Sequence, residues 1–149
     1  MKKVIKTLTL LVLINNCTYC QIKNTITDSF TIDTIKDYRI KLDGSCSFYS
    51  YDSIPENQLE RIFVISSKKV AFFALKDQHD YIYLKQMQVK ILKNGDRQKI
   101  FSGHGFKAIL VTRKTEKSNN CRLNCTRGEL KIARKKYKIK IPVRGIEDN

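Results

Sequence analysis

The chain has 149 residues, with 29 Lys and Arg against 14 Asp and Glu, which gives a formal net charge of +15. It contains only 6 Gly and 2 Pro and shows no heptads, repeats or low-complexity tracts, which excludes collagen-like, coiled-coil and linker-like chains. A chain of this length corresponds to one domain that can bury a core without disulfides as its main support.

The N-terminal segment has the layout of a secretory signal peptide. Three lysines precede a short apolar run, Leu8–Ile14, which gives way to polar residues as far as Cys20. The apolar run is much shorter than the roughly 20 residues that a membrane-spanning helix needs. We therefore expect a signal peptide, a flexible polar leader and one exported β-rich domain, over residues 1–20, 21–28 and 29–149.

The processing of this segment has competing interpretations. Cleavage after Cys20 would start the mature chain at Gln21 and release it into the periplasm or the medium. In a lipoprotein, Cys17 or Cys20 would instead be acylated and would anchor the domain to the envelope, although Ile14 stands where such signals usually carry Leu before Cys17. An uncleaved anchor is the third alternative.

Through most of the domain, apolar residues recur at every second position, which predicts strands and not helices. Asn94-Gly95-Asp96 is the strongest hairpin signal, because Asn and Gly tolerate positive φ. About eight strands at this spacing predict an all-β fold, a single antiparallel sandwich or barrel. The predicted strands are 38–42, 46–51, 62–65, 70–75, 81–92, 99–101, 106–112, 130–132 and 137–143.

Two of these strands carry more detailed expectations. In the strand 81–92, we expect Met87, Val89 and Ile91 on one face, with Gln86, Gln88 and Lys90 on the other. In the last strand, Pro142 cannot donate to a ladder, so it predicts an edge position or the end of pairing.

The positive charge is concentrated near the C-terminus. Residues 113–144 contain 12 basic and 2 acidic residues, and the alternation there predicts a hairpin with an apolar inner face and a basic outer face. Such a face favours anionic partners. Its alternative role is a solvated surface that keeps the protein soluble and discourages strand aggregation. The candidate binding residues are Lys131, Arg134, Lys135, Lys136, Lys138 and Lys140.

The compartment narrows the class of anionic partner. Only Tyr137 interleaves this basic segment, and no recognition-helix pattern occurs, so specific nucleic-acid binding is not predicted. Lipopolysaccharide phosphates, an acidic polysaccharide or an acidic protein fit an exported domain better. The oligomeric state is left open.

Outside the signal peptide, the sequence has three cysteines: Cys46, Cys121 and Cys125. In an oxidising compartment we expect one intrachain disulfide and one unpaired thiol. Cys121 and Cys125 can close a short loop, whereas a bond from Cys46 to either of them would join distant strands. The sequence does not choose between these pairings.

No motif predicts catalysis, a cofactor or a metal site. A nucleophilic pair would need a cysteine near His79 or His104, and no local signature surrounds any of these residues. The two histidines also lack metal-ligand spacing and are interpreted as exposed loop residues. The prediction is a non-enzymatic binding domain without metal or cofactor.

Four segments together resemble small exported bacterial proteins of unknown function. They are Gly44-Ser45-Cys46-Ser47-Phe48-Tyr49-Ser50, Ala71-Phe72-Phe73-Ala74-Leu75, Gly128-Glu129-Leu130-Lys131-Ile132 and Ile141-Pro142-Val143-Arg144-Gly145. The resemblance implies export and no particular activity.

Ser102-Gly103-His104-Gly105-Phe106 is similar to the Ser-Gly-x-x-Tyr element of periplasmic inhibitors of animal-type lysozyme. This resemblance implies an eight-stranded barrel whose loop enters the lysozyme cleft, and it gives the alternative function, lysozyme inhibition. Phe106 stands where the family has Tyr, and such lysozymes are basic, so a basic inhibitor would be repelled at long range.

Overall fold

The computed structural model describes residues 30–36, 46–54, 60–76, 78–115 and 125–147. The predicted signal peptide, leader and strand 38–42 lie outside these ranges. Within them the chain forms strands and no helix. The strands are β1 (Ile32–Asp33), β2 (Ser47–Tyr51), β3 (Arg61–Ile65), β4 (Val70–Leu75), β5 (Ile82–Ile91), β6 (Arg97–Gly103), β7 (Phe106–Lys114), β8 (Cys125–Arg134) and β9 (Tyr137–Ile146).

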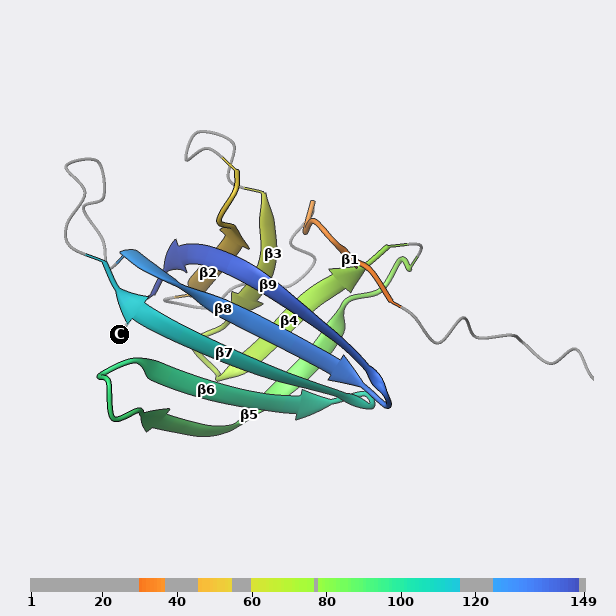
Figure 1. The fold of residues 1–149 in the computed structure, drawn as a ribbon. Helices are drawn as coiled ribbons and strands as arrows, with labels where there is room; N and C mark the ends of the chain where they lie inside the picture. The colour runs from red at the N-terminus through yellow and green to blue at the C-terminus, as the bar shows by residue number, and fades with distance from the viewer. Residues whose placement is uncertain (1–29, 37–45, 55–59, 77, 116–124, 148–149) are drawn as a thin grey trace, which may run out of the picture.

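The strands form a closed antiparallel barrel (Figure 1). Around the barrel the order is β4-β3-β2-β9-β8-β7-β6-β5, and β5 pairs back onto β4 to close it. β1 adds to β4 as an extra short strand. The all-β prediction is confirmed, and of the two expected architectures the chain adopts the barrel.

The inside of the barrel is filled with apolar side chains that come from alternate positions of every barrel strand. Phe63 is fully buried there and contacts Phe101 and Phe73, with ring centroids 5.6 and 6.5 Å away. Leu110, Leu130 and other fully buried residues complete this core. The barrel interior is therefore a packed core and not a channel.

β3 and β4 are buried on both faces because the N-terminal segment covers their outer side. Val64, Phe72 and Ala74 point outward from the barrel and form a second cluster with Ile35. The Ile35 N–H donates to the Arg61 carbonyl at 2.7 Å, which fixes this segment against β3. The continuous apolar runs of β3 and β4, unlike the alternation of β8 and β9, reflect this double burial.

The two ends of the barrel differ in chemistry. At the end that carries the β6–β7 and β8–β9 turns, the Phe106 ring packs edge-on against Phe30 and Phe73, with centroids 5.3 and 5.4 Å away. We call this the aromatic end. The opposite end carries the β5–β6 turn and, inside the barrel, Lys99 and Glu147; we call it the polar end.

The turn predicted from Asn94-Gly95-Asp96 is confirmed. Asn94, Gly95 and Asp96 form the β5–β6 turn, in which Gly95 has φ +84° and the Asn94 amide donates to the Asp96 carboxylate at 2.9 Å. The four residues Ser66–Lys69 join β3 to β4.

Pro142 marks the end of a ladder, which is the second of the two expected positions. β9 is a central strand, but its pairing with β2 stops at Val143. The Pro142 carbonyl accepts a hydrogen bond from the Asp52 N–H on the β2 side. The missing Pro142 N–H faces that same side, beyond the end of β2, so no ladder bond is lost.

The expected alternation along β5 is wrong in part, because a bulge interrupts the register between Gln86 and Gln88. Gln86 is paired with Phe101, which points into the barrel, so Gln86 does not share a face with Gln88 and Lys90. Met87 is the extra residue at the bulge.

Candidate functional site: the basic outer face of the barrel

The register of β7, β8 and β9 gathers basic side chains in cross-strand rows. Directly paired residues of neighbouring strands point to the same side of a sheet. One row joins Lys107 to Lys138 through Ala133, and the next pairs Lys131 with Lys140. These rows point outward, since Ile132 and Leu130, which alternate with them, are buried in the core.

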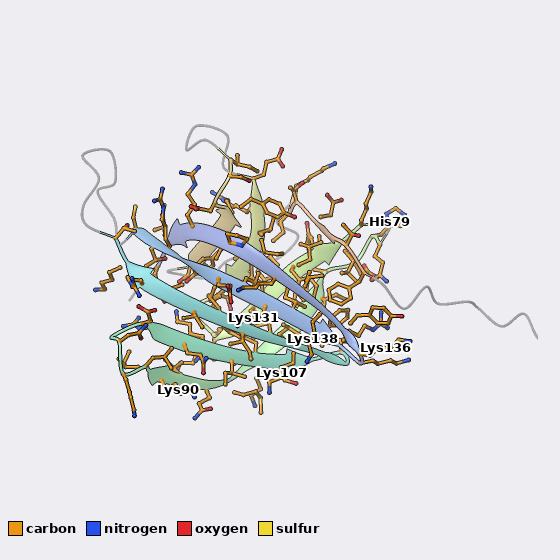
Figure 2. The ribbon with its side chains drawn as sticks, viewed as in Figure 1. His79, Lys90, Lys107, Lys131, Lys136 and Lys138 are labelled. Atoms are coloured by element: carbon orange, nitrogen blue, oxygen red, sulfur yellow. The ribbon has the colours of Figure 1, made fainter. Side chains whose placement is uncertain are left out.

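A third row, at the polar-end side of the same wall, consists of three arginines. We define the basic face as the cations of these rows: Lys107, Arg113, Arg127, Lys131, Lys138, Lys140 and Arg144. Figure 2 shows Lys107, Lys131 and Lys138 on this wall of the barrel.

Glu129 lies in the row between the Lys131–Lys140 pair and the arginines, where its partners are Val111 and Pro142. It lies between Lys131 and Lys140 and forms ion pairs with both, at 3.0 and 2.6 Å. The hydrogen bond from Lys140, followed by that from Lys131, holds the pKa of Glu129 below its usual range. Glu129 thus offsets the repulsion between two lysines that are direct cross-strand neighbours.

Acids at the margin neutralise two of the arginines. Arg113 forms a two-pronged ion pair with Asp96 in the β5–β6 turn, at 2.7 and 3.3 Å. Arg127 lies 3.3 Å from Asp52. By contrast, Lys107 and Lys138 have no acidic partner among the residues that the structure describes. These two lysines therefore contribute uncompensated positive charge to the basic face, and Lys131 and Lys140 add to it because they share the single carboxylate of Glu129.

The structure separates the predicted binding residues into two groups. Lys131, Lys138 and Lys140 share the outer face, as predicted. Lys135 and Lys136, also expected on this basic outer face, are instead in the β8–β9 turn, where Lys135 has φ +52°. Arg134 ends β8, and its guanidinium lies 5.0 Å above the Phe106 ring at the aromatic end.

Four members of the basic face were not predicted from the sequence: Lys107, Arg113, Arg127 and Arg144. All four alternate with buried residues of their strands, so the same period of two carried the signal. The sequence did not indicate that β7 pairs with β8 along the whole length of β7. This pairing adds a third strand to the predicted hairpin.

The polar end holds a buried ion pair that the sequence pattern did not predict. The Lys99 ammonium contacts the Glu147 carboxylate, whose side chain is 3% exposed, and the Arg97 guanidinium lies 3.7 Å from the same oxygen. Lys99 precedes Phe101 by two residues, and Glu147 follows Val143 by four, so both continue inward-facing rows. Burial, followed by the negative charge of Glu147, raises the pKa of Tyr49 inside the barrel.

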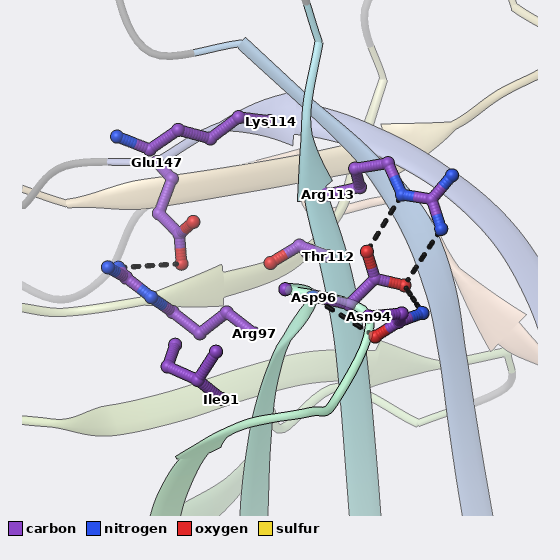
Figure 3. A pocket seen from close by; sticks show the side chains of 9 residues that line it. Ile91, Asn94, Asp96, Arg97, Thr112, Arg113, Lys114 and Glu147 are labelled. Atoms are coloured by element: carbon purple, nitrogen blue, oxygen red, sulfur yellow. Dashed lines mark hydrogen bonds and ion pairs between the residues drawn. The ribbon is translucent and has the colours of Figure 1, made fainter.

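A shallow pocket of about 270 Å³ opens beside this ion pair (Figure 3). Arg97 and Glu147 line one side, and Arg113 and Asp96 line the other. Both acids already have a cationic partner, so Lys114 at the rim adds uncompensated positive charge. The pocket extends the positive potential of the basic face toward the polar end.

The Ser102–Phe106 element forms a tight hairpin turn. His104 and Gly105 are its two central residues, with φ +49° and +75°, and Gly103 pairs directly with Phe106. Phe106 is only 3% exposed, because its ring is part of the core at the aromatic end. The position that corresponds to the Tyr of the lysozyme-inhibitor element is therefore not on the surface.

Among the described residues, the cysteines lie at the polar end, where Cys125 opens β8, and the histidines lie at the aromatic end. Cys46 is a buried thiol next to the start of β2, at the polar end. His79 and His104 are exposed and lie in connections at the aromatic end. Cys121 is outside the described residues, so the predicted pairing stays a prediction. Within the described ranges, no three His, Cys, Asp or Glu side chains are grouped to hold a metal ion.

No family model, curated protein or solved structure matches this chain. The two resemblances noted in the sequence therefore stay predictions. In the part of the chain that the structure describes, no helix is long and apolar enough to cross a membrane.

Proposed function

We propose that this protein is a non-enzymatic, exported domain that binds an anionic partner of the cell envelope or the extracellular medium through the basic face of β7, β8 and β9. The observation that carries the proposal is the clustering of seven cations around one acid, Glu129, on three neighbouring strands. Residues 1–20 supply the export signal in this proposal, and no cofactor or metal takes part.

The arrangement of the cations supports a polyanion as the partner. Direct cross-strand neighbours lie about 5 Å apart, and residues two positions apart on one strand about 7 Å. Both spacings are within the Debye length of about 8 Å at physiological salt, so the charges act together on one ligand. A phosphate-rich lipid headgroup layer, an acidic polysaccharide or an acidic protein surface presents charge at comparable spacing.

The proposal is tested by replacing Lys107, Lys131 and Lys138 with Ser and measuring binding to immobilised heparin and to anionic lipid vesicles over a range of salt concentrations. We expect weaker binding and a shallower salt dependence, by about one in the log–log slope for each lysine that contacts the polyanion. Folding should be almost unchanged, since exposed substitutions usually stay within about 0.5 kcal/mol.

The matched control replaces Lys36, Lys68 and Lys76, three exposed lysines of the opposite wall, with Ser. This variant loses the same net charge and should keep most of the binding. If both triple variants bind equally well, or lose binding equally, the basic face is a solubility feature and the proposal fails.

A further inference from the structure

β5 extends beyond the part of it that pairs with β4 to close the barrel. β4 pairs with β5 only from Ile82 to Lys85, and one further hydrogen bond joins the Gln86 N–H to the Lys69 carbonyl. Beyond this point Gln88–Ile91 pair with β6 on one side, and no strand among the described residues occupies the other side of Met87–Ile91. About 17 Å of strand therefore presents alternate N–H and C=O groups to solvent.

The same half-strand carries exposed apolar side chains. Met87, Val89 and Ile91 are 64%, 45% and 62% exposed, and all large apolar side chains classed as exposed in the described residues belong to β5. Natural proteins usually shield an edge strand with charge, with a covering segment or by keeping it short. Within the described part of the chain, Lys90 and the bulge at Met87 are the shielding features of this half-strand. An apolar edge of this kind is suited to accept another strand.

The charge around this edge selects the partner. Between Tyr81 and Gly95 the sequence has three lysines and no acid. Lys85, Lys90 and Lys93 have no ion-pair partner among the described residues. A second copy paired antiparallel about Val89 would place Lys85 opposite Lys93, and it would bring together two strongly basic chains. A strand with acidic side chains meets the lysines favourably instead.

We infer that Met87–Ile91 binds an extended, acidic segment of a partner protein by β-strand addition. The backbone of the segment pairs with the open edge of β5, its apolar side chains pack against Val89 and Ile91, and its carboxylates lie beside Lys85, Lys90 and Lys93. This inference concerns a different surface from the basic face and a different kind of recognition, through backbone hydrogen bonds. It does not depend on the proposed function.

The test uses a synthetic peptide of alternating Val and Glu as the probe and the folded, mature protein as the receptor. We expect saturable binding by fluorescence anisotropy, together with slower amide hydrogen exchange at Met87–Ile91. A peptide of the same sequence that is N-methylated at every second residue cannot donate to the ladder and should not bind. Because this control changes only the peptide, it does not depend on the folding of any variant.

Protein variants then separate the contributions of charge and apolar contact. Lys90→Glu should weaken binding about tenfold, as expected when a close charge pair is reversed, and Val89→Lys should weaken it through loss of the apolar contact. The triple Ser variant at Lys107, Lys131 and Lys138 should bind the peptide almost as well as the parent. This result would separate a failure of the strand-addition inference from a failure of the proposed polyanion binding by the basic face.

Three results would overturn the inference. The first is equal binding of the N-methylated peptide. The second is protection of β7–β9 amides in place of Met87–Ile91. The third is a dimer, detected by sedimentation, that dissociates in the Val89→Lys variant, because the occupant of the edge would then be a second copy of the chain.

Discussion

Lys99 on β6 and Glu147 after β9 form a buried ion pair that joins two strands of the barrel that are not neighbours in the sheet. Arg97 lies 3.7 Å from the same Glu147 carboxylate, so Glu147 has two cationic partners whereas Lys99 has one acidic partner. The loss of folding stability should therefore differ according to which of the two residues is replaced.

We predict that Glu147→Leu destabilises the protein more than Lys99→Met. Glu147→Leu leaves a buried ammonium without a counter-charge, at a cost of about 3–5 kcal/mol, whereas Lys99→Met leaves the carboxylate with Arg97. The double variant should recover most of the loss, since an apolar pair of similar volume avoids the desolvation of both charges. Urea unfolding of the parent and the three variants measures this cycle, and additive losses would contradict it.

The second prediction concerns Glu129, the acid among the cations of the basic face. Glu129→Gln should strengthen heparin binding, seen as elution at higher salt, because it removes the negative charge between Lys131 and Lys140. Glu60→Gln removes the same charge from an exposed site beside β3 and should leave elution almost unchanged. Equal shifts for the two variants would show that only the net charge matters.

Acidification should act in the same direction as Glu129→Gln. The pKa of Glu129 is lowered in the folded protein, so its ion pairs contribute stability that is present above the unfolded-state pKa of about 4.3 and is lost as the pH falls through the lower folded-state value. Heparin binding of the parent should therefore strengthen over that pH range, and the Glu129→Gln variant should lack this part of the increase.

The third prediction concerns Gly128, where β8 lies too close to β7 for a side chain. A Cβ atom at this position would be 1.9 Å from the Val111 carbonyl oxygen. Gly128→Ala should therefore destabilise the barrel by about 3 kcal/mol or more. Gly105→Ala has open space but needs φ +75°, so it should cost only about 1 kcal/mol. Thermal unfolding of the two variants compares the stability lost through steric overlap with that lost through backbone strain. A smaller loss of stability for Gly128→Ala than for Gly105→Ala would contradict the prediction.

The fourth prediction concerns the thiols. Cys46 is buried, so it should react with a thiol reagent only after unfolding. For the mature chain that starts at Gln21, we expect one thiol in the denatured, non-reduced protein, because one disulfide is predicted among Cys46, Cys121 and Cys125. A count of three would mean that no disulfide forms and would contradict the predicted oxidising compartment. Mass spectrometry of the same sample identifies the mature N-terminus or a lipid on Cys17 or Cys20.

Much of the fold follows from local patterns in the sequence. Inward Leu130 and Ile132 alternate with Glu129 and Lys131, and the period of two by itself determines a strand with one apolar and one charged face. The Asn94–Asp96 turn was also predictable from local sequence, because it requires a positive φ that Gly95 can adopt.

Closure and register were decided only by the tertiary structure. Whether eight strands form a sandwich or a barrel depends on the pairing of β4 with β5, which no local signal encodes. The bulge at Met87 depends on where β6 places Phe101 and Ile100, so the faces of β5 could not be assigned from its own sequence.

The residues of the candidate site also divide into those that the sequence indicated and those that only the tertiary structure brought together. The sequence by itself determined that Lys131, Lys138 and Lys140 project from strands into solvent, because their neighbours must fill the core. Only the pairing of β7 with β8 added Lys107 beside them, and only closure of the barrel brought Lys99 to Glu147. Strand periodicity is a property of consecutive residues, whereas these contacts join residues far apart in the chain, and their positions depend on how every strand between them pairs.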